Sequence, residues 1–168
     1  VGDFDSDGWL EMYSQGGVNG LAASRLPAEP LWYHRLADQG LYGSITDTRF
    51  QGLADIDGDG HTELGAGLRK GEFRCYDAAN GDLKWSVYIG SPTTDVCAAD
   101  VDGDGTDEFL FGTENGYLYA LGSGKDDPVL WKVDLGAPVG APIVVDLDRD
   151  GIGEILVVTR DGKLQCLR

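Results

Sequence analysis

Residues 55–63 read D-I-D-G-D-G-H-T-E, and three further stretches of the chain repeat this arrangement of acids and glycine. The copies are residues 3–11 (DFDSDGWLE), 100–108 (DVDGDGTDE) and 146–154 (DLDRDGIGE), so the shared pattern is D-x-D-x-D-G-x-x-E. The first Asp recurs after 52, 45 and 46 residues. A repeat of this period indicates a chain built from similar structural units. We number the four stretches loops 1 to 4.

Short apolar runs surround each loop and predict β-strands. In the third repeat, residues 108–113 follow the loop, an Asn-Gly turn comes at 115–116, and residues 117–121 and 130–135 supply two more runs. Asn-Gly between strand-forming residues is a strong hairpin signal. With an apolar run before the loop, each unit holds four short antiparallel strands. The 26 glycines and the lack of any apolar stretch of about 18 residues agree with a turn-rich β protein without a membrane span.

Units of this length with four strands predict an all-β fold of β-propeller blades. We expect one repeat domain over residues 1–168, with units at about 1–49, 50–94, 95–140 and 141–168. The first and last units are incomplete, and together they do not supply a missing fourth strand. Because a propeller avoids open edges by closing its ring, we expect these residues to belong to a larger propeller or assembly.

A tryptophan recurs with the same rhythm as the loops. Trp32, Trp85 and Trp131 follow the first Asp of their repeats by 29, 30 and 31 residues. A large aromatic side chain at a fixed place in each blade is suited to the contact between neighbouring blades. We therefore expect these tryptophans to be core residues rather than a ligand platform.

The acidic loops have the chemistry of calcium sites. Calcium takes six to eight oxygen ligands, and Asp at positions 1, 3 and 5, a backbone carbonyl at position 7 and a bidentate Glu at position 9 supply about six. Gly at position 6 permits a sharp reversal of the backbone. One Ca²⁺ per loop, about four in all, is expected. The predicted ligands are Asp3, Asp5, Asp7, Trp9, Glu11, Asp55, Asp57, Asp59, His61, Glu63, Asp100, Asp102, Asp104, Thr106, Glu108, Asp146, Asp148, Asp150, Ile152 and Glu154.

The charge balance supports a metal in these loops. The net charge is −16, and the loops contain sixteen of the 29 acids, so the other thirteen match the 13 Lys and Arg residues. Four carboxylates in one short loop repel each other strongly without a cation. The EF-hand is excluded, because its twelfth position needs a Glu and here holds Ser14, Ala66, Phe111 or Val157. Magnesium is disfavoured, since it keeps its own waters in a tight octahedron.

The four loops, each followed by a strand, resemble the FG-GAP or VCBS-type calcium repeats of integrin α-subunit heads and bacterial surface proteins. The resemblance implies propeller blades in which calcium rigidifies the loop between the first two strands, at the acids named above. Residues 77–85 (DAANGDLKW) more weakly resemble PQQ-like propeller repeats. That second resemblance implies blade architecture alone, because the adjacent cysteine pair of the quinoprotein enzymes has no counterpart here.

An enzyme is not expected. The two histidines, His34 and His61, show no triad spacing, and G-x-S-x-G and G-x-x-x-x-G-K-[ST] are absent. Some calcium-bearing propellers are polysaccharide lyases, which is the enzymatic alternative. Such a reaction needs a basic group beside an acidic sugar, and Arg69, Lys70 and Arg74 are the candidates.

We therefore expect a secreted or cell-surface module, extracellular or periplasmic, that binds protein or glycan through surface loops, for adhesion or scaffolding. A structural subunit that self-assembles through open blade edges is the third alternative. The negative charge disfavours nucleic acid and anionic membranes. Residues 15–30, with Gly-Gly at 16–17 and two prolines, are expected to be a long loop insertion and a candidate partner surface.

Overall fold

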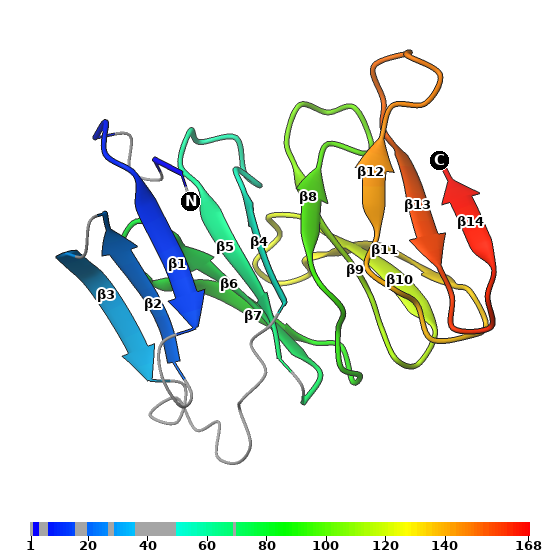
Figure 1. The fold of residues 1–168 in the computed structure, drawn as a ribbon, viewed down its shortest axis with the longest axis horizontal. Helices are drawn as coiled ribbons and strands as arrows, with labels where there is room; N and C mark the ends of the chain where they lie inside the picture. Colours follow the sequence, from blue (N-terminus) through cyan, green and yellow to red (C-terminus); the bar gives the residue numbers. More distant parts are fainter. Residues whose placement is uncertain (1, 4–6, 16–19, 27–28, 36–49, 69) are drawn as a thin grey trace.

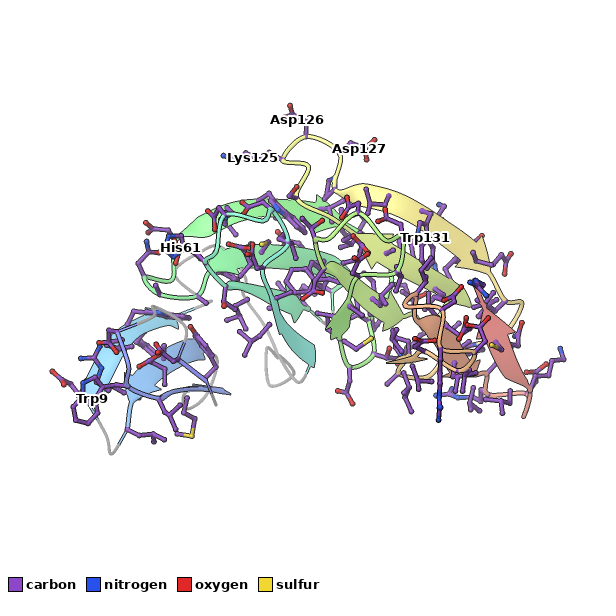
Figure 2. The ribbon with its side chains drawn as sticks, turned by 90° about the horizontal axis from the view of Figure 1, so that it is seen from above. Trp9, His61, Lys125, Asp126, Asp127 and Trp131 are labelled. Atoms are coloured by element: carbon purple, nitrogen blue, oxygen red, sulfur yellow. The ribbon has the colours of Figure 1, made fainter. Side chains whose placement is uncertain are left out.

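The computed structural model describes residues 2–3, 7–15, 20–26, 29–35, 50–68 and 70–168. These residues form an all-β protein of four antiparallel sheets, which stand side by side in chain order along a curved row (Figures 1 and 2). We call the sheets blades 1 to 4. The described residues include no helix of the length and hydropathy needed to cross a membrane.

The strands follow the chain order within every blade. Blade 1 contains β1 (Glu11–Gln15), β2 (Gly20–Arg25) and β3 (Glu29–Arg35). Blade 2 contains β4 (Phe50–Ala54), β5 (Glu63–Gly67), β6 (Glu72–Asp77) and β7 (Leu83–Tyr88). Blade 3 contains β8 (Cys97–Ala99), β9 (Glu108–Gly112), β10 (Tyr117–Leu121) and β11 (Val129–Asp134). Blade 4 contains β12 (Ile143–Val145), β13 (Glu154–Val158) and β14 (Leu164–Leu167).

The register of the strands repeats from blade to blade. Loops 2, 3 and 4 join β4 to β5, β8 to β9 and β12 to β13. The following hairpins turn at Gly71, Gly116 and Gly162, all with positive φ, a conformation that glycine adopts without strain. The next pairing has a bulge beside the tryptophan strand, between Ala23 and Ser24, Cys75 and Tyr76, or Ala120 and Leu121. Equivalent positions in different blades can therefore be compared directly.

The core lies where the blades face each other. Strands β5 and β9 are buried along their whole length, as expected of strands covered on both faces. Phe73 of blade 2 stacks on Phe111 of blade 3, with ring centroids 4.9 Å apart, and also contacts Phe109 at 5.7 Å. Leu110 and Leu118 of blade 3 pack with Ile155 and Val157 of blade 4 in the same way. Each blade thus depends on its neighbour to bury its apolar side chains.

The three repeating tryptophans are core residues, as predicted. Trp85 is 5% exposed and stacks on Phe73 in the cluster between blades 2 and 3. Trp32 packs against the cluster of blade 2, and its Nε1 donates a hydrogen bond of 3.0 Å to the carbonyl oxygen of Ala78. Trp131, labelled in Figure 2, packs against the cluster shared by blades 3 and 4. Each tryptophan therefore joins its blade to the next one.

The predicted loop at residues 15–30 is wrong. Gly20–Arg25 form β2, which pairs with β1 on one side and with β3 on the other, and β3 begins at Glu29. The spacing explains the error, because the 29 residues from Asp3 to Trp32 are no more than the 30 or 31 in other repeats. The extra length of the first repeat lies after Trp32, mostly at 36–49, outside the described residues. The segment is therefore the middle of blade 1, not an insertion.

Candidate metal centre

The first Asp of each loop organises the backbone of that loop. In loop 2, Asp55 accepts hydrogen bonds from the N–H groups of Gly58 at 2.8 Å and Gly60 at 2.9 Å. Asp100 makes the equivalent pair with Gly103 and Gly105 at 2.6 and 2.9 Å. Asp146 and Asp3 accept equivalent bonds from the N–H groups of Gly151 and Gly8. The aspartate therefore holds the loop closed around its own carboxylate, as in other Asx-type turns.

The glycine at position 6 serves its conformation rather than a tight space. Gly8, Gly60, Gly105 and Gly151 have φ between 84° and 95°. A Cβ atom added at any of them would meet no atom within 4 Å. The expectation that a side chain would be obstructed there thus holds for the backbone conformation but not for a clash with neighbouring atoms.

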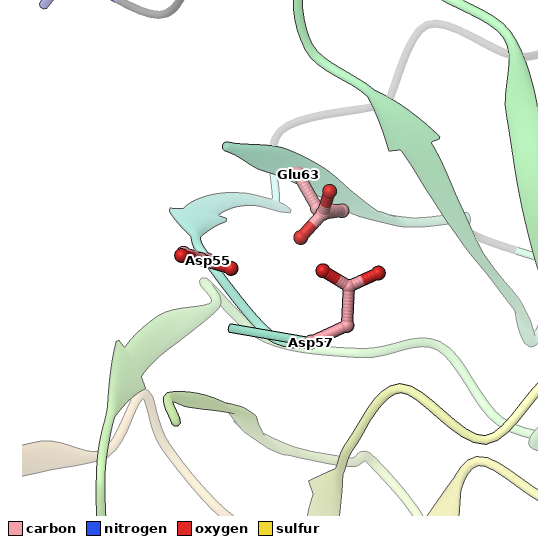
Figure 3. A group of neighbouring side chains, drawn as sticks. All are labelled: Asp55, Asp57 and Glu63. Carbon is pink, nitrogen blue, oxygen red and sulfur yellow. The ribbon is translucent and has the colours of Figure 1, made fainter. Parts of the chain in front are cut away.

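Three loops bring acids 1, 3 and 9 together. Carboxylate oxygens of Asp55, Asp57 and Glu63 all lie within 4.8 Å of one another, and Figure 3 shows the three groups facing a common space. Loops 3 and 4 form the same group, from Asp100, Asp102 and Glu108 and from Asp146, Asp148 and Glu154. In loop 1, Asp5 lies outside the described residues, so that group is not described.

The Glu at position 9 is buried in every loop. Glu11, Glu63, Glu108 and Glu154 are at most 6% exposed, although a carboxylate is costly to bury without partners. In loops 2, 3 and 4 its Oε2 accepts the backbone N–H of position 2, from Ile56 at 3.1 Å, Val101 at 3.0 Å and Leu147 at 2.8 Å. One oxygen thereby anchors the start of the loop, and the carboxylate is fixed beside acids 1 and 3.

Burial makes the ionised form of these glutamates unfavourable. Desolvation raises the pKa of Glu108 to about 7, and the negative charges of Asp102, Asp104 and Asp100 act in the same direction. Desolvation also raises the pKa of Glu63, although an ion pair with Lys84 opposes the change. A divalent cation beside such a carboxylate would offset both the desolvation and the repulsion.

Positions 5 and 7 are arranged differently from the other ligands. Asp7, Asp59, Asp104 and Asp150 belong to none of the described acid groups, and each accepts the N–H of the residue at position 7 of its loop. That residue is Trp9, His61, Thr106 or Ile152, and the first two have exposed side chains. Only the backbone was expected to matter at position 7. Participation of positions 5 and 7 in metal binding stays a prediction.

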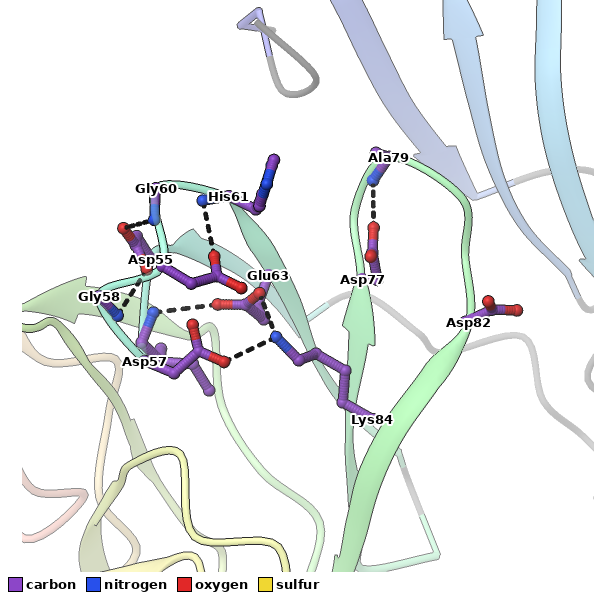
Figure 4. Close-up of polar contacts among 12 residues, drawn as sticks. Asp55, Asp57, Gly58, Gly60, His61, Glu63, Asp77, Ala79, Asp82 and Lys84 are labelled. Atoms are coloured by element: carbon purple, nitrogen blue, oxygen red, sulfur yellow. Dashed lines mark hydrogen bonds and ion pairs between the residues drawn. The ribbon is translucent and has the colours of Figure 1, made fainter.

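Basic side chains enter three of the four loops, which the sequence interpretation missed. Lys84 of β7 places its Nζ 2.8 Å from Asp57 and 2.7 Å from Glu63 (Figure 4). Arg25 pairs with Asp7 and Glu11, and Arg168 pairs with Asp148, Asp150 and Glu154. A signal existed, since both arginines follow the first Asp of their repeat by 22 residues.

These ion pairs change the electrostatics of loop 2. Hydrogen bonding to Lys84 lowers the pKa of Asp57. Burial lowers the pKa of Lys84, but its pairs with Asp57 and Glu63 outweigh this and raise the pKa overall. Lys84 is therefore a firmly charged ammonium group within the acid group.

The basic cluster considered for an enzyme is not assembled as a site. Arg74 is 8% exposed and forms an ion pair of 3.0 Å with Glu72, so it is engaged inside blade 2. Lys70 is exposed but takes part in another interaction. Arg69 and the side chain of His34 lie outside the described residues. Arg74, the candidate with described contacts, is thus already committed to a carboxylate of its own strand.

Comparisons with known proteins place the fold but no family. No family model matches the chain, and no curated protein matches it. Among solved structures it resembles BBS1N in complex with ARL6DN, with a TM-score of 0.70 and 15% identity over 95% of this chain and 47% of that one. It also resembles BamB from Moraxella catarrhalis, with a TM-score of 0.65 and 17% identity over 93% and 42%. A third is the Pseudomonas aeruginosa PilY1 C-terminal domain, with a TM-score of 0.65 and 13% identity over 92% and 37%.

These likenesses define the class of the protein. BamB and PilY1 are propellers, and the four antiparallel sheets in a curved row are blades of the same architecture. The predicted fold is therefore confirmed. The chain spans less than half the length of each of these structures. At such low identity the likeness extends to the fold alone.

Proposed function

We propose that this chain is a calcium-binding propeller module that serves binding or scaffolding rather than catalysis. The observation that carries the proposal is the recurrence of one acid group, at the same place in blades 2, 3 and 4, with a buried Glu in each. The donors are all carboxylate oxygens, the ligands that calcium prefers. A chain gains little from three buried, clustered carboxylates unless a cation compensates them.

The residues present fit such an ion. In loop 2 the Lys84 ammonium already stands for a cation between Asp57 and Glu63, which indicates that the group is shaped to surround positive charge. When bound, calcium would supply charge neutralisation and would tie the loop to the strand that follows it. Acids at positions 1, 3 and 9 would hold it, with position 5 and the carbonyl of position 7 completing the set. The ion would therefore be structural.

We further propose a protein partner and an extracellular or cell-surface setting. BBS1N, a neighbour in fold, was crystallised in complex with ARL6DN, which supports a propeller of this kind as a protein-binding platform. Binding residues of such a scaffold are expected on its connecting loops. The hairpin tip at Lys125, Asp126 and Asp127 projects beyond the sheets and is one such element (Figure 2). Glycan binding, adhesion and self-assembly through blade edges remain further proposals of the same class.

Native mass spectrometry with and without a chelator tests the metal. We expect bound calcium ions that chelation removes, together with a thermal transition that rises with calcium concentration, because a ligand that binds only the folded state stabilises it. Magnesium at equal concentration is the control and is expected to bind more weakly. A protein whose mass and unfolding transition are the same in calcium and in chelator would contradict the proposal.

A further inference from the structure

The acid groups of blades 2 and 3 differ at one position in the tryptophan strand. In β7, Tyr76 pairs with Leu83 and Cys75 pairs with Trp85, so Lys84 is the bulged residue without a register partner. In β11, Leu121 pairs with Val129 and Ala120 with Trp131, so Leu130 is the equivalent residue. The bulge aims this side chain toward the end of the middle strand, beside the acidic loop.

Leu130 lies where the comparison requires. A Cβ atom at Gly122, the residue that follows β10, would approach Cδ1 of Leu130 to 3.1 Å. Gly122 itself corresponds to Arg25 in blade 1 and Arg168 in blade 4, each 22 residues after the first Asp. Blade 3 therefore has a leucine where blade 2 has its lysine, and a glycine where blades 1 and 4 have their arginines.

As a result, loop 3 contains no internal cation. In the part of the chain that the structure describes, no basic side chain forms an ion pair with Asp100, Asp102 or Glu108, whereas Asp57 and Glu63 share Lys84. The other charged groups that act on Glu108 are the acids Asp102, Asp104 and Asp100. The three carboxylates of this group lack the compensation that their counterparts have.

An ammonium group and a calcium ion cannot both be close to the same oxygens. Calcium binds carboxylate oxygens at about 2.3–2.6 Å, and Lys84 already contacts Asp57 and Glu63 at 2.8 and 2.7 Å. Two cations held this close would repel each other strongly in a partly buried site. Calcium must therefore displace Lys84 from loop 2, whereas it meets no internal competitor in loop 3.

We infer that Lys84 is a built-in cation that weakens calcium binding at loop 2, and that loop 3 is consequently the tightest calcium site among the described loops. Arg25 and Arg168 have the same effect on loops 1 and 4. The inference rests on the proposed calcium binding and adds that the four repeats, although alike in sequence, are graded in affinity. Calcium thus fills loop 3 first, and the other loops respond only at higher concentration.

Exchanging the two bulge residues tests this inference. We would prepare Lys84→Leu, Leu130→Lys and the wild type, and count the tightly bound ions by native mass spectrometry at limiting calcium, with calorimetry for the affinities. The wild type is expected to hold one tight ion, Lys84→Leu two, and Leu130→Lys none. Each exchange is expected to change the affinity of its own loop at least about tenfold, since affinity follows the charge at the site.

A second readout needs no metal. In chelator, Lys84→Leu is expected to unfold at lower temperature than the wild type, because it leaves Glu63 and Asp57 without their cation, and Leu130→Lys at higher temperature. Lys132→Leu and Val133→Lys change the same charges on β11 away from its bulge position and serve as controls. Their tight-ion count is expected to equal that of the wild type.

The outcomes separate this inference from the function on which it rests. Calcium bound by all three proteins, with equal numbers of tight ions, would overturn the graded sites and leave calcium binding intact. Calcium bound by none of them, Lys84→Leu included, would overturn both. A tight ion that is lost in Leu130→Lys and gained in Lys84→Leu supports both.

Discussion

Glu108 accepts a hydrogen bond of 3.0 Å from the backbone N–H of Val101, through an oxygen that lies beside Asp100 and Asp102. One carboxylate therefore links the last position of the loop to its second position and also faces the acid group. The same bond joins Glu63 to Ile56 and Glu154 to Leu147. The Glu is thus both a fastener of the loop and a candidate ligand, and the two roles respond differently to pH and calcium.

The first prediction concerns pH without calcium. Burial raises the pKa of Glu108 from 4.5 to about 7, so the folded state binds this proton more tightly than the unfolded state. The resulting stability is present below about pH 4.5 and is lost as the pH rises through about 7. In chelator, the free energy of unfolding of the wild type relative to Glu108→Gln is expected to fall by up to about 3 kcal/mol between those limits. Urea unfolding at a series of pH values measures it.

Calcium supplies the control for this prediction. A bound ion favours the ionised carboxylate, so the difference between the wild type and Glu108→Gln is expected to grow with calcium at neutral pH rather than shrink. Glu114→Gln, an exposed acid in the turn of the same blade, is the matched variant and is expected to show neither effect. A pH profile that is the same for the wild type and Glu108→Gln in chelator would show that this carboxylate is ionised throughout.

Much of this arrangement could be predicted because local chemistry dictates the loop residues. The position-6 glycines have positive φ, and the first Asp binds backbone N–H groups within its own loop, so residue type follows from neighbours in sequence. The blade register followed from the same spacing, together with the hairpin glycines at 116 and 162. Where one segment decides its own structure, a single sequence is informative.

The ion pairs with Lys84, Arg25 and Arg168 could not be read in this way. Lys84 reaches loop 2 from the strand two places away in the sheet, and it does so only because the bulge displaces it by one residue. A lysine in a strand with the sequence Leu-Lys-Trp is otherwise expected to face solvent. The misassigned β2 has a related cause, since its small residues in Gly20–Arg25 acquire strand structure from pairing on both sides.

Backbone strain in loop 4 gives the second prediction. Arg149 is the described non-glycine residue with positive φ, at 64°, where loops 2 and 3 have Gly58 and Gly103. A side chain in this conformation costs roughly 1–2 kcal/mol, so Arg149→Gly is expected to raise the free energy of unfolding by about 1 kcal/mol. Chemical denaturation measures it. Arg149→Lys keeps both the charge and the strain and is expected to match the wild type, and an equal gain from Arg149→Lys would assign the effect to something other than the backbone.

The packing between blades 2 and 3 gives the third prediction. Trp85 is 5% exposed and stacks on Phe73, with ring centroids 6.0 Å apart. Trp85→Ala leaves a large cavity in this cluster and is expected to cost about 3–5 kcal/mol of unfolding free energy. Trp9→Ala removes a side chain that is 59% exposed, so it is expected to change stability by about 0.5 kcal/mol or less. Calcium binding by Trp9→Ala should also be unchanged, because only the backbone of position 7 is a predicted ligand. If both variants lost the same stability, the blade contact would not depend on Trp85.

A buried hydroxyl at the start of blade 3 gives the last prediction. Thr93 is 2% exposed, and its Oγ1 has no hydrogen-bond partner among the described residues. Its bridge to Thr113 corresponds to the bridge between Val139 and Thr159 in blade 4, so blade 4 places a valine where blade 3 has this threonine. A buried polar group without a partner destabilises the fold, whereas a methyl group of the same shape does not.

Thr93→Val is therefore expected to increase the free energy of unfolding by about 1 kcal/mol. Thr113→Val is the matched contrast, because Thr113 is fully buried but its Oγ1 donates to Asn115 at 2.7 Å and accepts the N–H of Tyr117 at 3.0 Å. Loss of those bonds is expected to cost about 1–3 kcal/mol. The two variants make the same chemical change at bridged positions, so opposite signs in urea unfolding would follow from hydrogen bonding alone. Destabilisation by both would mean that Thr93 has a polar partner in solution, such as a bound water, and that its hydroxyl is satisfied.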